Sequence, residues 1–139
     1  MTVILTENII LSRTRSHDLK DVRKLNCWNF ELTDVSMVRR MPSVQILSLS
    51  LNKISTLSDF AHCPQLEELY LRKNDIADIN ELYYLTSLQK LRKLWLAENP
   101  CAEAPNYRHT VLKALPDLEI LDNIPVQDDG KKRQTNSQC

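Results

Sequence analysis

The sequence predicts a single α/β domain built as a solenoid, with a short parallel sheet on its concave face, a helical or irregular convex side and a helical cap at each end. Three observations predict this architecture. A pattern of 14 residues recurs at a spacing of 22 residues, apolar and polar residues alternate within each copy, and helical patterns flank the copies. A fixed repeat of this length is typical of stacked units that share one core.

The repeat is clearest in the middle of the chain. Residues 44–57 read VQILSLSLNKISTL and residues 66–79 read LEELYLRKNDIADI. Both fit apolar-x-x-Leu-x-Leu-x-x-Asn-x-Ile, which is the leucine-rich-repeat pattern. The pattern recurs 22 residues earlier, in VRKLNCWNFELTDV, and 25 residues later, in LRKLWLAENP, after three extra residues within 81–90. We therefore place the repeats at 22–43, 44–65, 66–90 and 91–105.

The centre of each repeat, x-Leu-x-Leu-x, predicts a short strand, because successive side chains of a strand point to opposite faces. One face then carries the residues that stack into a common core. These inward residues are Leu25, Cys27, Leu47, Leu49, Leu69, Leu71, Leu94 and Leu96.

An asparagine follows three of the strands, at Asn52, Asn74 and Asn99, and Phe30 holds this position in the first repeat. An amide carries donors and an acceptor, so it can satisfy backbone groups where the chain turns inward. We interpret the three asparagines as a structural ladder rather than as metal ligands or catalytic groups. Phe30 fits this interpretation, because an edge repeat has fewer neighbouring turns to satisfy.

Both ends of a solenoid need caps, since its core is otherwise open. Ser16 is placed to cap a short helix within 16–25. Residues 106–125 predict a second cap, with a helix that Pro116 stops and with Leu118 and Leu121 covering the last strand. The apolar residues at helical spacing there are Tyr107, Val111, Leu112 and Leu115. We expect a capped domain at 1–125 and a disordered tail, or a truncation point, at 126–139.

Composition argues against several functions. The 18 Lys and Arg balance the 18 Asp and Glu, so net charge gives no general attraction to nucleic acid or membranes. The single glycine, Gly130, excludes glycine-rich phosphate-binding loops. No segment reads as a signal peptide or a membrane span. We expect no enzyme activity and no cofactor, because repeat faces are shallow and enzymes prefer deep pockets.

The four cysteines, Cys27, Cys63, Cys101 and Cys139, show no paired short spacing. Without a secretory signal this indicates free thiols in a reducing compartment, cytosolic or nuclear. Cys63 and Cys101 could in principle join His62 and His109 in a zinc site. The spacing matches no known zinc cluster, so we predict no metal site.

The outward strand positions form the candidate functional surface. In register they stack into three columns, which read Lys24, Ile46, Glu68, Lys93, then Asn26, Ser48, Tyr70, Trp95, then Trp28, Ser50, Arg72, Ala97. Aromatic residues and Arg are enriched in protein interfaces. We predict a protein-binding groove, and the alternative is that the tryptophans pack against flanking loops or a cap. The predicted binding residues are Trp28, Lys24, Tyr70, Arg72, Glu68, Trp95 and Lys93.

Several segments carry a family resemblance beyond the generic repeat. The terminal YRHTVLKALPDLEILDN resembles the cap of the cytoplasmic and nuclear leucine-rich-repeat group, which includes the U2 small nuclear ribonucleoprotein A-prime. RKLNCW, ELYLRKN, ELYYL and LWLAENPC resemble the N-terminal repeat domain of the cilia- and flagella-associated protein 410 family. The resemblance covers residues 10–125.

The resemblance implies a non-enzymatic scaffold of the basal body, needed for cilium or flagellum assembly. It implies cytoplasmic and cytoskeletal localisation, with NIMA-related kinase and other basal-body partners. The family's helical, self-associating C-terminal segment is missing here, so we expect this fragment to be monomeric. The alternative is a nuclear, protein-binding subunit of an RNA-protein particle, as in the U2 relative. We expect no direct contact with nucleic acid or membrane.

Overall fold

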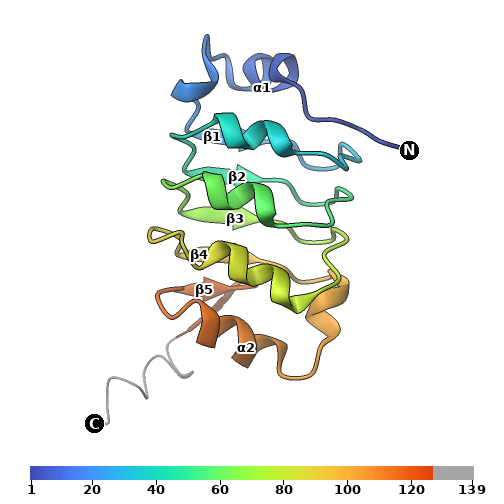
Figure 1. Cartoon of the computed structure of the whole chain (residues 1–139), viewed down its shortest axis with the longest axis vertical. Helices are drawn as coiled ribbons and strands as arrows, with labels where there is room; N and C mark the ends of the chain where they lie inside the picture. Colours follow the sequence, from blue (N-terminus) through green and yellow to red (C-terminus); the bar gives the residue numbers. More distant parts are fainter. Residues whose placement is uncertain (127–139) are drawn as a thin grey trace.

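The computed structural model describes residues 1–126 and confirms the predicted leucine-rich-repeat solenoid (Figure 1). The strands are β1 (Lys24–Asn26), β2 (Ile46–Ser48), β3 (Glu68–Tyr70), β4 (Lys93–Trp95), β5 (Ile120–Leu121) and β6 (Ile124–Pro125). Two α-helices close the ends, α1 (Glu7–Thr14) and α2 (Tyr107–Ala114). Short 3-10 helices form the other side, η1 (Leu19–Asp21), η2 (Ser36–Arg40), η3 (Ser58–His62), η4 (Ile79–Leu85) and η5 (Pro100–Glu103).

The six strands within residues 1–126 form one sheet in sequence order. Strands β1 to β5 are parallel, and the register aligns Lys24 with Ile46, then Glu68, then Lys93. The columns expected from the repeat are therefore the columns of the sheet. The sequence pattern did not predict β5 and β6 as strands, where the chain pairs Leu121 with β4 and then folds back as an antiparallel hairpin.

The core lies between the sheet and the 3-10 helices. All eight inward residues of the first four strands are at most 2% exposed. Val38, Phe60 and Leu82 enter the same core from η2, η3 and η4. Figure 1 shows these helices stacked in front of the strands, one per coil. Stacking four coils therefore buries a face that a single coil would expose.

The asparagines tie adjacent coils together through buried backbone groups. Asn74 donates to the carbonyls of Leu49 and Leu71 at 3.0 and 3.1 Å and accepts from the amide of Ile54 at 3.0 Å. Asn52 and Asn99 repeat this arrangement one coil to either side. Each amide thus bonds its own coil and the preceding one.

The residue before each ladder asparagine, and before Phe30 at the same position of the first coil, adopts a left-handed backbone conformation. The φ angles are 62° for Asn29, 57° for Leu51, 60° for Lys73 and 64° for Glu98. Non-glycine residues adopt this conformation at a cost of about 1–2 kcal/mol. The same strained turn therefore recurs in every coil, at the place where the chain bends inward from the sheet.

The N-terminal cap differs from the one expected. Ser16 does not begin a helix. Instead Thr6 caps α1 by accepting from the amide of Ile9 at 3.2 Å. The helix ends at Thr14 and is followed by Arg15 in a left-handed conformation. A 3-10 turn capped by Asp18 follows. A Thr before an acidic residue is itself a helix-start signal, and Glu7 follows Thr6.

The C-terminal cap has the expected helix, α2, in which Val111 and Leu112 are buried. Asp122 stands at the end of the ladder and accepts from the amides of Leu96 and Ala97 at 2.7 and 2.9 Å. Val126, which we placed at the start of the tail, is 3% exposed and donates to the carbonyl of Glu119 at 3.0 Å. The fold therefore includes it, and residues 127–139 of the expected tail lie outside the described residues.

Replacing Asn74 by Ala should lower the free energy of unfolding by about 1–3 kcal/mol, because the buried amide of Ile54 loses its partner. The carbonyls of Leu49 and Leu71 keep a second donor, from Asn52 and Asn99 respectively. Urea denaturation measures the change. Asn80→Ala is the matched control, since Asn80 is exposed, and should change stability by less than about 0.5 kcal/mol. Equal effects of the two substitutions would contradict the ladder.

Lys73→Gly should raise the free energy of unfolding by about 0.5–1 kcal/mol, since Gly removes the cost of the left-handed conformation and adds a smaller entropic cost. Glu67→Gly, at an exposed position in the same coil with a negative φ, should instead lower it by about 0.5–1 kcal/mol. Thermal unfolding of both variants tests the difference in sign. Destabilisation by Lys73→Gly would show that the turn is unstrained.

Candidate protein-binding surface

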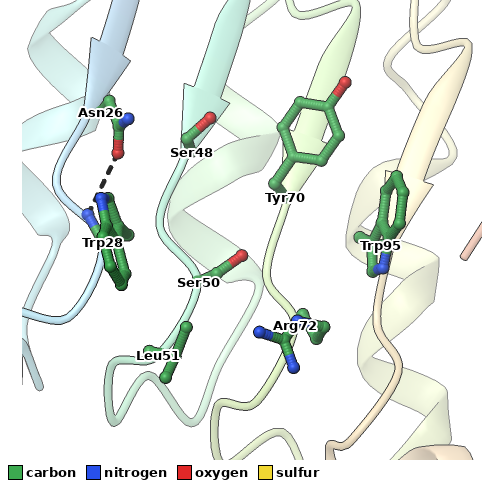
Figure 2. A pocket seen from close by; sticks show the side chains of 8 residues that line it. All are labelled: Asn26, Trp28, Ser48, Ser50, Leu51, Tyr70, Arg72 and Trp95. Atoms are coloured by element: carbon green, nitrogen blue, oxygen red, sulfur yellow. Dashed lines mark hydrogen bonds between the residues drawn. The ribbon is translucent and has the colours of Figure 1, made fainter.

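An open hollow of about 490 Å³ lies on the concave face of the sheet. It spans β1 to β4, so its walls come from four different coils. Figure 2 shows large side chains on both sides and two small ones between them. Its lining residues are Asn26, Trp28, Ser48, Ser50, Leu51, Tyr70, Arg72 and Trp95.

One wall is the aromatic pair of Tyr70 and Trp95, which are register partners on β3 and β4. Their ring centroids lie 5.6 Å apart and the ring planes are inclined by 46°. This tilted geometry is favourable for aromatic pairs. The parallel pairing of the strands brings the two rings together, so the pair is a direct consequence of the repeat.

Glu68 links this wall to the charged column. The Tyr70 hydroxyl donates to its Oε1 at 2.5 Å, and Lys93 Nζ lies 3.9 Å from its Oε2. Burial and the carboxylate of Glu68 raise the pKa of Tyr70 to about 12. The phenol is therefore neutral at physiological pH and held in a single orientation.

The opposite wall is Trp28, which follows β1 and is 52% exposed. Its amide donates to Asn26 Oδ1 at 3.2 Å, the contact drawn in Figure 2. The cap helix supports this segment, because Arg13 Nε donates to the carbonyl of Asn26 at 2.6 Å. The Arg13 guanidinium also lies 5.0 Å from the centre of the Phe30 ring. Such a cation–ring contact is attractive.

Between the walls, β2 and the residues after it contribute the small side chains of Ser48 and Ser50. This is why the face is hollow at this point. Leu51 and Arg72 form the lower rim (Figure 2). Arg72 Nη1 is paired with Glu98 Oε2 at 2.6 Å, so its charge is neutralised within the structure.

The predicted binding residues therefore divide into three sets. Four line the hollow, namely Trp28, Tyr70, Arg72 and Trp95, and two, Glu68 and Lys93, flank its aromatic wall. Lys24 is exposed on β1 and outside the lining. Sequence reasoning missed Leu51 and Arg13. Leu51 could have been suspected as an apolar residue at a turn, whereas nothing local indicated that Arg13 reaches β1.

The residues weighed as a possible zinc site do not form a metal-binding cluster. Within residues 1–126, no group of three or more His, Cys, Asp or Glu side chains could hold a metal ion. Cys63 is buried and its Sγ donates to the carbonyl of Val38, while Cys101 is buried two coils away. Burial raises the pKa of Cys63 to about 12 and that of Cys101 to about 11, which makes both poor nucleophiles. None of the described helices has the length and apolar character to cross a membrane.

Comparisons with known proteins agree with the fold. A family model described as leucine-rich repeat matches residues 16–138. Cilia- and flagella-associated protein 410 of Mus musculus is 51% identical over 131 residues, which cover 93% of this chain and 53% of that protein. The Homo sapiens protein of the same name is 49% identical, with coverage of 93% and 51%. The chain thus spans about half the length of these relatives.

A chain in the crystal structure of the Drosophila melanogaster SNF/U2A′ complex is similar in fold, with a TM-score of 0.71. The alignment covers 98% of this chain and 91% of that chain at 21% sequence identity. This likeness shows a common solenoid architecture and no more, because so few residues are shared.

The pKa of Tyr70 should be measurable as a titration near pH 12, whereas an ordinary tyrosine titrates near 10. The difference in absorbance at 295 nm between the chain and its Tyr70→Phe variant isolates this group. Because the folded pKa is raised, the stability that Tyr70 contributes is complete below pH 10 and is lost as pH rises from 10 to 12. Glu68→Gln should lower the midpoint but leave it above 10, since burial is the larger cause. A midpoint near 10 in the intact chain would contradict the arrangement.

Proposed function

The chain belongs to the leucine-rich-repeat family and is a homologue of cilia- and flagella-associated protein 410. From this premise we propose that it is a non-enzymatic scaffold that binds a protein partner on its concave face. The observation that carries the proposal is the half-buried aromatic wall of Tyr70 and Trp95 beside an open hollow. Leucine-rich repeats are typical interaction modules, and none of the relatives described above is named as an enzyme.

The composition of the hollow favours a protein over a small ligand. Two tryptophans, a tyrosine and an arginine are the residue types that dominate the binding energy of protein interfaces. The serines between them leave room for side chains of a partner and carry hydroxyls that can donate or accept. The hollow is open along the sheet, so an extended surface can reach all its walls.

The names of the relatives support a place in the cilium or flagellum. We propose that the chain acts at the basal body, on the cytoskeletal side of the cytoplasm, in cilium or flagellum assembly. By the same family resemblance its partners include a NIMA-related kinase and other basal-body proteins. Because the chain spans about half of those relatives, these roles are assigned to the repeat domain as proposals.

A pull-down from ciliated cells, read by mass spectrometry, tests the proposal. The intact chain should enrich basal-body proteins and the double variant Tyr70→Ala, Trp95→Ala should lose them at least tenfold. The double variant should stay folded and melt cooperatively but several degrees below the intact chain, because both rings are half-buried. Truncating them removes that burial as well as about 0.5–1.5 kcal/mol from the ring contact.

The matched control is Tyr83→Ala, Tyr84→Ala, which removes two exposed aromatic residues from η4, away from the hollow. It should capture the same proteins as the intact chain. Equal capture by all three proteins would place binding elsewhere. Enrichment of splicing factors in place of basal-body proteins would instead support the nuclear alternative and overturn the ciliary assignment.

A further inference from the structure

Charge is distributed unevenly around the hollow. On the β3–β4 side each cation has a partner, since Arg72 is paired with Glu98 at 2.6 Å and Lys93 lies 3.9 Å from Glu68. That wall therefore presents aromatic rings with little net charge. A partner gains mainly apolar contact there, because rim charges that are already paired contribute little to binding.

The β1 side differs. Within residues 1–126, neither Lys24 nor Arg13 has a carboxylate within ion-pair distance. Lys24 is exposed on the concave face of β1, and Arg13 reaches the carbonyl of Asn26 on the same strand. Arg13 uses only Nε for this bond, so its remaining donors stay available. Two uncompensated cations therefore lie on the β1 side of the hollow, Lys24 on the concave face of the strand and Arg13 at its Asn26 carbonyl.

We propose that the occupant of the hollow is a protein segment with a large apolar side chain and a carboxylate a few residues away, oriented with the carboxylate over β1. The apolar side chain lies above Ser48 and Ser50, between Trp28 and the Tyr70–Trp95 pair. The carboxylate pairs with Lys24 and with the free donors of Arg13. This inference rests on the proposed binding function and adds the chemistry and direction of the partner.

The dimensions of the sheet suit such a segment. Neighbouring strands lie about 4.8 Å apart, so β1 and β3 are separated by about 10 Å, with Ser48 of β2 and the following Ser50 between them. Lys24 and Asn26 lie two residues apart on β1, a distance of about 7 Å. A side chain that fills the hollow and an acidic group at Lys24 therefore belong to positions within about three residues of each other in the partner.

A protein fits this surface better than nucleic acid does. RNA would bring a phosphate with every nucleotide along the hollow, and on the β3–β4 side Glu68 and Glu98 already pair with the nearby cations. Two uncompensated cations match one or two carboxylates and would neutralise few phosphates. The chain as a whole has no net charge to attract a polyanion.

Selection from a random twelve-residue phage-display library on the immobilised chain tests the proposal. The selected peptides should be enriched in aromatic or large aliphatic residues within three positions of Asp or Glu. For a synthetic copy of the most enriched peptide, Lys24→Glu should weaken binding about tenfold, and raising salt from 50 to 500 mM should weaken it severalfold. Lys113→Glu is the control, since it makes the same charge change on α2, and should leave affinity within twofold.

The outcomes separate the two proposals. Peptides that need Tyr70 and Trp95 but bind Lys24→Glu equally well would overturn the acidic partner and leave the binding function intact. Failure to select any peptide, or selection of basic peptides, would also overturn it. The same variants are also tested against a fluorescent uridine oligonucleotide. If the intact chain binds it more tightly than it binds the peptide, and Lys24→Glu loses that binding, the site would be assigned to RNA instead.

Discussion

The amide of each ladder asparagine is the contact on which the rest of the structure depends. It joins carbonyl groups from two successive coils and accepts an amide of the earlier one, so neighbouring coils cannot slide or rotate against each other without leaving buried groups unpaired. A single coil has no way to bury its leucines, whereas coils held in this register form a continuous core. The parallel register of the strands follows, and with it the alignment of outward side chains into columns.

Residues that stabilise the solenoid and residues that are available for recognition occupy different positions of each repeat. The inward leucines and the asparagines are constrained by the core, and the left-handed residue before each ladder position is constrained by the turn. The outward positions carry no such constraint, so they can vary from coil to coil. Here they are Trp28 in the first coil, Ser48 and Ser50 in the second, and Tyr70 and Trp95 in the next two. The small side chains between large ones create the hollow.

The sequence predicted the features that depend on the period. The inward set, the columns and the C-terminal helix could be read from spacing, because every coil imposes the same geometry on its residues. The features that the sequence did not predict each occur once in the chain. The position of α1, the strand pairing of Leu121 and the reach of Arg13 to Asn26 are set by the ends of the stack, where no neighbouring coil repeats the pattern. The hollow itself depends on the side chains of four coils together. The sequence pattern identifies these side chains but does not give the space between them.

At the N-terminal edge the same residues contribute to both stability and recognition. The first coil has Phe30 where later coils have asparagine, so the ladder stops there, and Asn52 supplies its oxygen to the amides of Phe30 and Leu32. The outer edge of β1 then needs a different partner, and Arg13 from α1 provides it at the carbonyl of Asn26 while its guanidinium rests on Phe30. An uncharged donor could close the same edge, but a guanidinium also leaves a cation at β1. The residue that seals the solenoid is therefore part of the electrostatic character of its binding face, so the cap and the recognition surface cannot be altered independently at this end.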